Sequence, residues 1–164
     1  RAREVLRSAE RILRESEGLL CDQHATRHQA RRLRVFALSA AAEGATTEGT
    51  TAEGAREPAQ MVAALEACVE GMQAQLPPAH PELAFFRHRL AEALARQAAA
   101  AAAGSAARRQ LARRSRAAAE ASVLALATAY GSDHPQVARW RHEQRQYGTA
   151  DTVEKGSAQR PAQN

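Results

Sequence analysis

The chain has 164 residues and a formal net charge of +5, with 45% hydrophobic but only 4% aromatic residues. Alanine supplies most of the hydrophobic fraction, which favours close-packed helices and leaves little β-branched or aromatic material for strands. No apolar run approaches the ~20 residues of a membrane span, and two cysteines are too few for a disulfide framework. The composition therefore predicts an all-α chain with no membrane contact that works inside the cell, in the cytoplasm or the nucleus.

Helical periodicity of apolar residues, interrupted by glycines and prolines, predicts six helices in chain order. Their expected ranges are 2–18, 27–43, 58–76, 81–98, 107–130 and 135–146. In the second helix the apolar stripe consists of Leu33, Phe36, Ala37 and Ala40. In the fourth helix it consists of Leu83, Phe86, Leu90 and Leu94. These helices predict one helical domain over residues 1–146.

Two low-complexity tracts interrupt the helices. Residues 44–57 are small and polar, and residues 98–107 are mostly alanine, so neither tract carries enough large apolar surface to form a core. Both are predicted to be insertions. Residues 147–164 are predicted to be a disordered tail.

The most specific pattern is an internal repeat. Leu76-x3-His80-Pro81-x-Leu83-Ala84 aligns without a gap with Tyr130-x3-His134-Pro135-x-Val137-Ala138. Each proline disfavours helix at the histidine before it and presets φ for the helix that follows. Gly131 is suited to end a helix, and Ser132 or Asp133 to cap the next one. His80, Pro81, Gly131, Asp133, His134 and Pro135 are therefore predicted to build two matching turns. Such turns predict antiparallel helix pairs stacked as a short superhelix like that of tetratricopeptide (TPR) repeats.

With these turns the chain resembles two families. The Asp133-His134-Pro135 turn and the following Val137-Ala138 resemble the long TPR-like repeats of kinesin light chains. The whole run from Val5 to Gln146 resembles more closely the C-terminal helical region of SET- and MYND-domain (SMYD-type) lysine methyltransferases.

The second resemblance implies a scaffold that shapes substrate or partner access in a larger methyltransferase. The catalytic residues, S-adenosylmethionine and zinc would then belong to the rest of that protein, because none of its cofactor or zinc motifs occurs in this sequence. No catalytic residue, metal or cofactor is expected within these 164 residues. The alternative is a stand-alone adaptor repeat of the kinesin-light-chain type that binds acidic peptides.

Cys21-x2-His24-x3-His28 is the one spacing that resembles half of a zinc site. Because no second cluster supplies the remaining ligands, an ordinary polar linker is the preferred interpretation. His88 and His142 fall near arginines and are predicted to be solvated. Tyr130 and Trp140 lie at helical positions beside the last turn and are predicted to pack in the core.

Arginine is concentrated in one part of the chain, with eight arginines against Glu92 alone between Arg87 and Arg116. This face is interpreted as solvated, as a contact for acidic proteins, or, less favourably, as a nucleic-acid contact, since no aromatic residues accompany it for base stacking. The candidate electrostatic contacts to an acidic protein or peptide partner are Arg31, Arg34, Arg87, Arg113 and Arg114.

Overall fold

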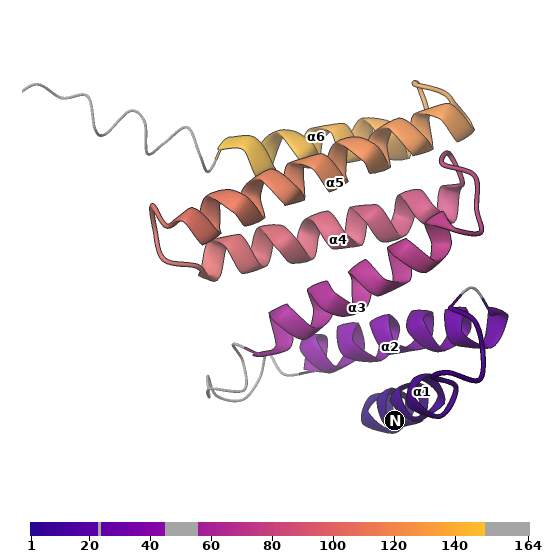
Figure 1. Ribbon diagram of the computed structural model, residues 1–164. Helices are drawn as coiled ribbons and strands as arrows, with labels where there is room; N and C mark the ends of the chain where they lie inside the picture. The colour runs from indigo at the N-terminus through magenta and orange to yellow at the C-terminus, as the bar shows by residue number, and fades with distance from the viewer. Residues whose placement is uncertain (23, 45–55, 150–164) are drawn as a thin grey trace, which may run out of the picture. The chain divides into compact units, whose positions relative to one another are not determined.

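The computed structural model describes residues 1–22, 24–44 and 56–149, and over these ranges the regular structure is entirely α-helical (Figure 1). The predicted all-α fold is confirmed there. The helices are α1 (Ala2–Glu15), α2 (Ala25–Gly44), α3 (Arg56–Gln73), α4 (Pro81–Ala100), α5 (Ala106–Tyr130) and α6 (Pro135–Thr149). Within the described part of the chain, none of these helices combines the length and apolarity needed to cross a bilayer.

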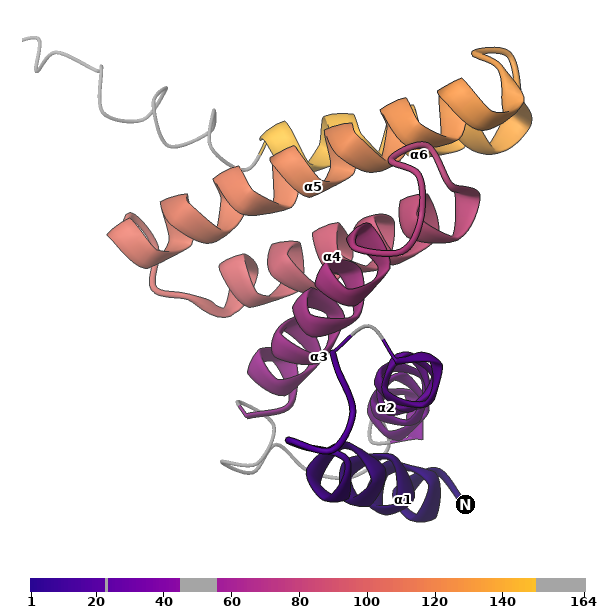
Figure 2. The same cartoon turned by 45° about the vertical axis from the view of Figure 1, so that its right-hand side comes forward.

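The helices group into two compact units, which divide between residues 78 and 79. Unit 1 holds α1, α2 and α3, with α2 packing on both of the others. Unit 2 holds α4, α5 and α6, and α5 packs on both of its neighbours. In both views α5 turns back along α4, and α6 turns back along α5 (Figures 1 and 2). Consecutive helices of unit 2 are thus antiparallel, whereas the stacking of antiparallel pairs from all six helices into one superhelix stays a prediction.

The low-complexity tract at 98–107 is half helical, and its origin as an insertion stays a prediction. α4 continues to Ala100 and α5 begins at Ala106, which leaves a loop of only residues 101–105. Ala98 is buried, because a small side chain suits a close helix contact. Gly104 adopts a φ of 70°, and the Ser105 hydroxyl accepts a hydrogen bond from Arg108 N at 3.1 Å, which caps α5.

The other low-complexity tract, 44–57, and the predicted disordered tail, 147–164, lie mostly outside the described residues. Gly44 belongs to α2, and Arg56 and Glu57 belong to α3, while residues 45–55 lie outside the described residues. α6 continues to Thr149, and residues 150–164 of the predicted tail also lie outside them.

The core of unit 2 forms where the three helices meet. A cluster of buried residues joins Ala84, Val123, Ala125, Leu126, Val137 and Trp140. Trp140 is 5% exposed, as predicted, but Tyr130 is 54% exposed, so its prediction as a core residue is wrong. Tyr130 is the last residue of α5, and its ring instead stacks on the ring of His134, which precedes α6, with centroids 5.0 Å apart.

In unit 1 the apolar stripe predicted for α2 does not match the buried face. Leu33 and Ala40 are exposed and Phe36 is 50% exposed, while Ala37 is the one member that is buried. The buried residues of α2 are Ala30, Val35, Ala37 and Leu38. α2 packs against α1 and α3 through this face, because its small residues allow the helices to approach closely. The face that carries Leu33 and Phe36 stays exposed.

Candidate functional site

His24, His80 and His134 each cap a helix in the same way. The predicted repeat included His80 and His134 but not His24. Nδ1 of His80 accepts a hydrogen bond from Glu82 N at 3.2 Å, and Nδ1 of His134 accepts one from Gln136 N at 3.2 Å. His24 does the same for Thr26 N, also at 3.2 Å. The caps stand 56 and 54 residues apart in the sequence, so this near-constant spacing was the signal that could have revealed His24.

These caps define how each turn works. A helix leaves its first backbone N–H groups without partners, and an acceptor at the N-cap satisfies one of them. The predicted helix-starting prolines, Pro81 and Pro135, stand at the first helical position. Gly131 ends α5 with a φ of 91°, a conformation that favours glycine. The cap of α6 is His134 rather than Ser132 or Asp133, whose side chains hydrogen-bond to each other.

The zinc-like spacing Cys21-x2-His24-x3-His28 does not gather into a metal site. His24 is occupied as the cap of α2, and Cys21 is an exposed free thiol. Across residues 1–22, 24–44 and 56–149 no group of three or more His, Cys, Asp or Glu side chains is placed to hold a metal ion.

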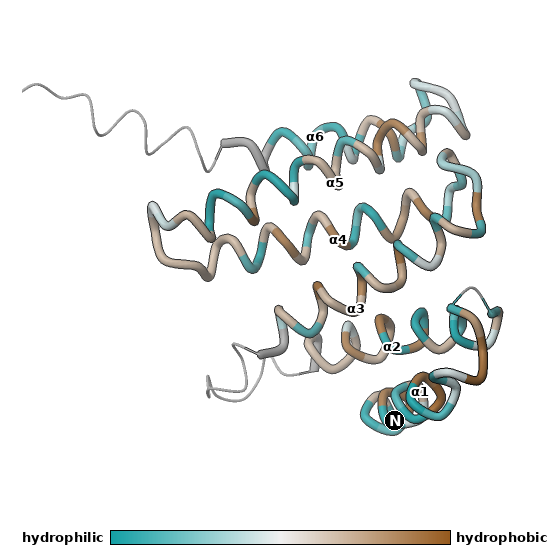
Figure 3. Tube along the Cα trace, in the orientation of Figure 1, coloured by the Kyte–Doolittle hydropathy of each residue, from teal (hydrophilic) through white to brown (hydrophobic). Residues whose placement is uncertain are grey.

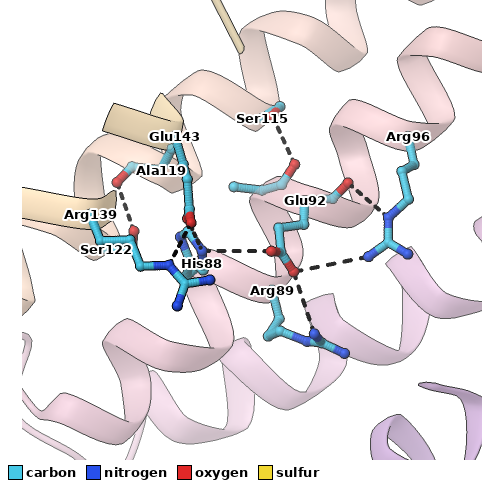
Figure 4. Close-up of polar contacts among 10 residues, drawn as sticks. His88, Arg89, Glu92, Arg96, Ser115, Ala119, Ser122, Arg139 and Glu143 are labelled. Atoms are coloured by element: carbon cyan, nitrogen blue, oxygen red, sulfur yellow. Dashed lines mark hydrogen bonds and ion pairs between the residues drawn. The ribbon is translucent and has the colours of Figure 1, made fainter. Parts of the chain in front are cut away.

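His88 is buried in unit 2 beside charged side chains that are themselves partly exposed, so its prediction as a solvated residue is wrong. It is 6% exposed, and its ring stacks on Trp140 of α6 with centroids 4.1 Å apart and planes 10° from parallel. Its Nε2 lies 3.0 Å from the Glu143 carboxylate and 3.7 Å from that of Glu92 (Figure 4). This histidine therefore ties α4 to α6.

Further charges surround the two glutamates. Arg139 Nε donates to Glu143 at 2.8 Å, and Arg89 and Arg96 lie 3.5 and 3.9 Å from Glu92. The same region contains a buried tie between α5 and α4, in which the Ser115 hydroxyl donates to Ala91 O at 2.8 Å (Figure 4).

Burial lowers the pKa of His88, while the carboxylates of Glu92 and Glu143 act in the opposite direction and Arg139 adds to the lowering. The neutral ring, with its Nε2–H directed at Glu143, fits this environment. Nδ1 of His88 is buried and has no hydrogen-bond partner among the described residues, so a proton there would be a buried unsatisfied donor. The cluster is thus better suited to holding helices together than to exchanging protons.

Two of the predicted contact arginines are engaged inside unit 1. Arg31 donates to the carbonyl and the carboxylate of Asp22 at 2.8 and 2.9 Å. A Cβ placed on Gly71 of α3 would come within 2.8 Å of the Arg31 guanidinium, so the absence of a side chain at Gly71 makes room for it. Arg34 lies 3.7 Å from Glu10 of α1.

The other three predicted arginines belong to unit 2. Arg87 is half-buried, and burial lowers the pKa of its guanidinium. Arg113 and Arg114 are exposed on the hydrophilic first half of α5 (Figure 3), where Arg113 Nε donates to Arg109 O at 3.4 Å. None of these three arginines lines the hollow that lies between α5 and α6.

That hollow, of about 400 Å³, lies between α5 and α6. Its lining residues are Arg116, Glu120, Arg141, Gln144 and Arg145. We call the space that these residues line the α5–α6 hollow. Arg141 donates to Ser132 O at 3.2 Å, whereas Arg116 and Arg145 make no hydrogen bond or ion pair with other described residues. The antiparallel pairing of α5 and α6 was predicted from the turn, and it could have suggested that arginines from the two helices meet.

Comparisons of the chain with profiles of known protein families, with curated proteins and with solved structures find no significant match.

Proposed function

We propose that this chain is a helical-repeat scaffold that binds a negatively charged segment of a partner protein through the α5–α6 hollow. The observation that carries the proposal is that two arginines from neighbouring helices, Arg116 and Arg145, line one hollow and have no ion-pair partner among the described residues. Arginine forks bind carboxylates and phosphates in bidentate geometry, and each such bond is stronger when both groups are charged.

The elements that position the hollow are rigid. α5 is capped by Ser105 at its start and ended by Gly131, and α6 is capped by His134. Trp140 is buried in the core, so the helix that carries Arg141 and Arg145 is fixed in rotation about its axis. A site on packed helices holds its side chains more precisely than a site on loops does.

A protein partner fits the hollow better than a nucleic acid does. The lining contains no aromatic side chain on which bases would stack. It also contains Glu120, which would repel one of the closely spaced phosphates of a nucleic-acid strand.

The larger protein to which such a scaffold belongs is a separate proposal. The repeated histidine turns support the helix-turn-helix arrangement on which both resemblances rest, those to SET- and MYND-type methyltransferases and to kinesin light chains. We retain the first, with S-adenosylmethionine and zinc held elsewhere in that protein, and place it in the cytoplasm or the nucleus. A lysine-methylation assay of the full-length protein tests it, and an inactive full-length protein with further helix pairs favours the adaptor.

Binding is tested with the whole chain and a fluorescein-labelled peptide of alternating glutamate and glycine, by fluorescence anisotropy at several salt concentrations. The variant Arg116→Glu with Arg145→Glu is expected to weaken binding by about tenfold or more, because each reversal replaces an attraction with a repulsion. Arg3→Glu with Arg7→Glu, exposed on α1, changes the net charge equally and is expected to weaken binding much less.

A third variant separates the hollow from the arginine stripe of α5. Arg113→Glu with Arg114→Glu reverses two charges outside the lining, so it is expected to have a smaller effect than the hollow variant. Equal effects of all three charge reversals would mean that net charge alone governs binding, which would refute the proposed site.

A further inference from the structure

We infer that the α5–α6 hollow recognises a single phosphoryl group on the partner, on a phosphorylated serine, threonine or tyrosine with a basic residue nearby. This inference rests on the proposed function and names the chemistry of its ligand. It depends on three features of the hollow: the number of guanidinium groups, the anchoring of one of them, and the presence of Glu120.

The hollow offers more positive charge than one carboxylate needs. Three arginines, Arg116 of α5 and Arg141 and Arg145 of α6, line the same hollow together with Gln144. One arginine fork already satisfies a carboxylate in bidentate geometry, whereas a phosphoryl group brings three strong acceptor oxygens and a charge of about −1.5 to −2 at pH 7. Several arginines from two helices around one hollow are therefore matched to the dianion.

One of the three guanidinium groups is held in place before any ligand arrives. The Arg141 guanidinium donates to Ser132 O at 3.2 Å, and this exposed bond orients its side chain toward the α5–α6 turn. Arg116 and Arg145 have no such bond among the described residues, so they are available to close on the ligand from opposite helices. An anchored donor with two adaptable ones lowers the ordering cost of binding compared with three free side chains.

Glu120 makes the site selective for an isolated anion. It follows Arg116 by one helical turn, lines the hollow, and has no ion-pair partner among the described residues. A run of acidic residues would bring a second carboxylate close to Glu120 and be repelled. A lysine or arginine next to the phosphorylated residue would instead pair with it. The hollow thus favours a phosphorylated residue in a basic context over a polyacidic segment.

The experiment uses the whole chain and four labelled probe sets of identical length. Three are peptide libraries with randomised flanks around a fixed central position, which is phosphorylated (serine, threonine or tyrosine), unphosphorylated, or glutamate. The fourth is a single-stranded RNA of random sequence. Selected peptides are resynthesised and their affinities measured by anisotropy for the unaltered chain, for Arg116→Ala with Arg145→Ala, for Glu120→Gln, and for the matched control Arg3→Ala with Arg7→Ala.

The phosphorylated peptides are expected to bind at least about tenfold more tightly than their glutamate counterparts, since the dianion engages more arginine donors than a carboxylate does. The Arg116 and Arg145 variant is expected to abolish this preference, and the control to keep it. Glu120→Gln is expected to remove the enrichment of basic residues in the selected flanks while leaving the requirement for phosphate.

The other outcomes overturn the inference in distinguishable ways. If glutamate peptides bind as tightly as phosphorylated ones through Arg116 and Arg145, the inference fails while the proposed function stands. If no peptide set binds through these arginines, both fail. If the RNA binds most tightly and loses affinity in the Arg116 and Arg145 variant, the hollow is a nucleic-acid site and both fail.

Discussion

The two units use their arginines in different ways. In unit 1, Arg31 and Arg34 are ion-paired with Asp22 and Glu10, and the Arg31 guanidinium lies against Gly71. In unit 2, Arg116 and Arg145 face a hollow without an ion pair among the described residues. An arginine thus joins the framework where it forms an ion pair within the unit, and remains available for a ligand where, as for Arg116 and Arg145, it forms none with a described residue.

The carboxylates of unit 2 explain this difference. Glu92 and Glu143 both lie at His88, where Arg89, Arg96 and Arg139 share them. Because these glutamates are committed to the cluster around His88, the hollow retains Glu120 alone against its three arginines. In this cluster a histidine ties α4 to Glu143 of α6, whereas in unit 1 Arg34 of α2 pairs with Glu10 of α1.

The largest effect is expected where the tie of unit 2 is removed. His88→Ala should lower the free energy of unfolding by about 2–3 kcal/mol, because it opens a cavity beside Trp140 and removes the contact between His88 Nε2 and the Glu143 carboxylate. Urea unfolding followed by circular dichroism measures the loss. His142→Ala, an exposed position on α6, serves as the control, with an expected change within about 0.5 kcal/mol. Equal small effects would show that His88 is not a tie.

The same variant has a second signature in its pH dependence. Because burial lowers the pKa of His88, the unfolded chain takes up this proton at a higher pH than the folded chain does. The stability linked to His88 is therefore complete above the ordinary histidine pKa of 6.5 and is lost as the pH falls through the lower folded value. His88→Ala should remove this part of the acid dependence. The groups facing the ring, Glu92, Glu143 and Arg139, remain in that variant, so an unchanged slope between pH 7 and 5 would contradict the assignment.

The turns were more predictable from the sequence than the helix faces were. Proline and glycine act locally, so the start of α4 at Pro81 and the end of α5 at Tyr130 match their predictions. The burial of His88 depends on a second face of α4, formed with Ala84 and Ala91, that carries no large apolar residue. Hydrophobic periodicity identified the face with Leu83 and Phe86, while His88 was predicted to be solvated from its neighbouring arginines, because only the packing of α5 and α6 reveals the other face.

Which arginines form ion pairs with carboxylates could not be predicted from the sequence either. Arg31 and Arg113 are both arginines on helices, yet Arg31 reaches the Asp22 carboxylate before α2, whereas Arg113 donates to the backbone carbonyl of Arg109. The distance between a guanidinium and a carboxylate depends on turn conformation and helix rotation, which the spacing of residues does not specify. Arg145 was missed for the same reason, since its neighbour Arg116 belongs to another helix.

A smaller effect is expected in unit 1, where the Arg31 guanidinium lies against Gly71. Gly71→Ala would gain about 1 kcal/mol from helix propensity but displace the Arg31 guanidinium, so the net change should be near zero. In an Arg31→Ala background nothing is displaced, and Gly71→Ala should then be stabilising by about 1 kcal/mol. The double-mutant cycle therefore predicts a coupling of about 1 kcal/mol, measured by urea unfolding. Additive changes would mean that the Arg31 guanidinium does not need the space at Gly71.

The histidine caps allow a direct comparison between the units. Replacing His80 by Ala should cost about 0.5–1 kcal/mol, and replacing it by Asn, another good N-cap, only a few tenths. His24→Ala should cost more than His80→Ala, because Ala25 lacks the fixed φ that Pro81 provides at the first helical position. Thermal and urea unfolding of the four variants, His24→Asn included, provide the test. A larger loss at His80 would indicate that its ring has contacts beyond the cap.

The smallest effect is expected in the hollow itself. Arg145→Ala and Arg116→Ala should each change the free energy of unfolding by less than about 0.5 kcal/mol, since neither guanidinium has a described partner to lose. Arg31→Ala should cost about 1 kcal/mol, because it removes charge-assisted hydrogen bonds from a side chain that is 13% exposed. A loss at Arg145 as large as that at Arg31 would make Arg145 part of the framework. The hollow would then lack the uncommitted charge on which anion binding depends, so equilibrium unfolding alone tests the basis of the proposed function before any ligand is added.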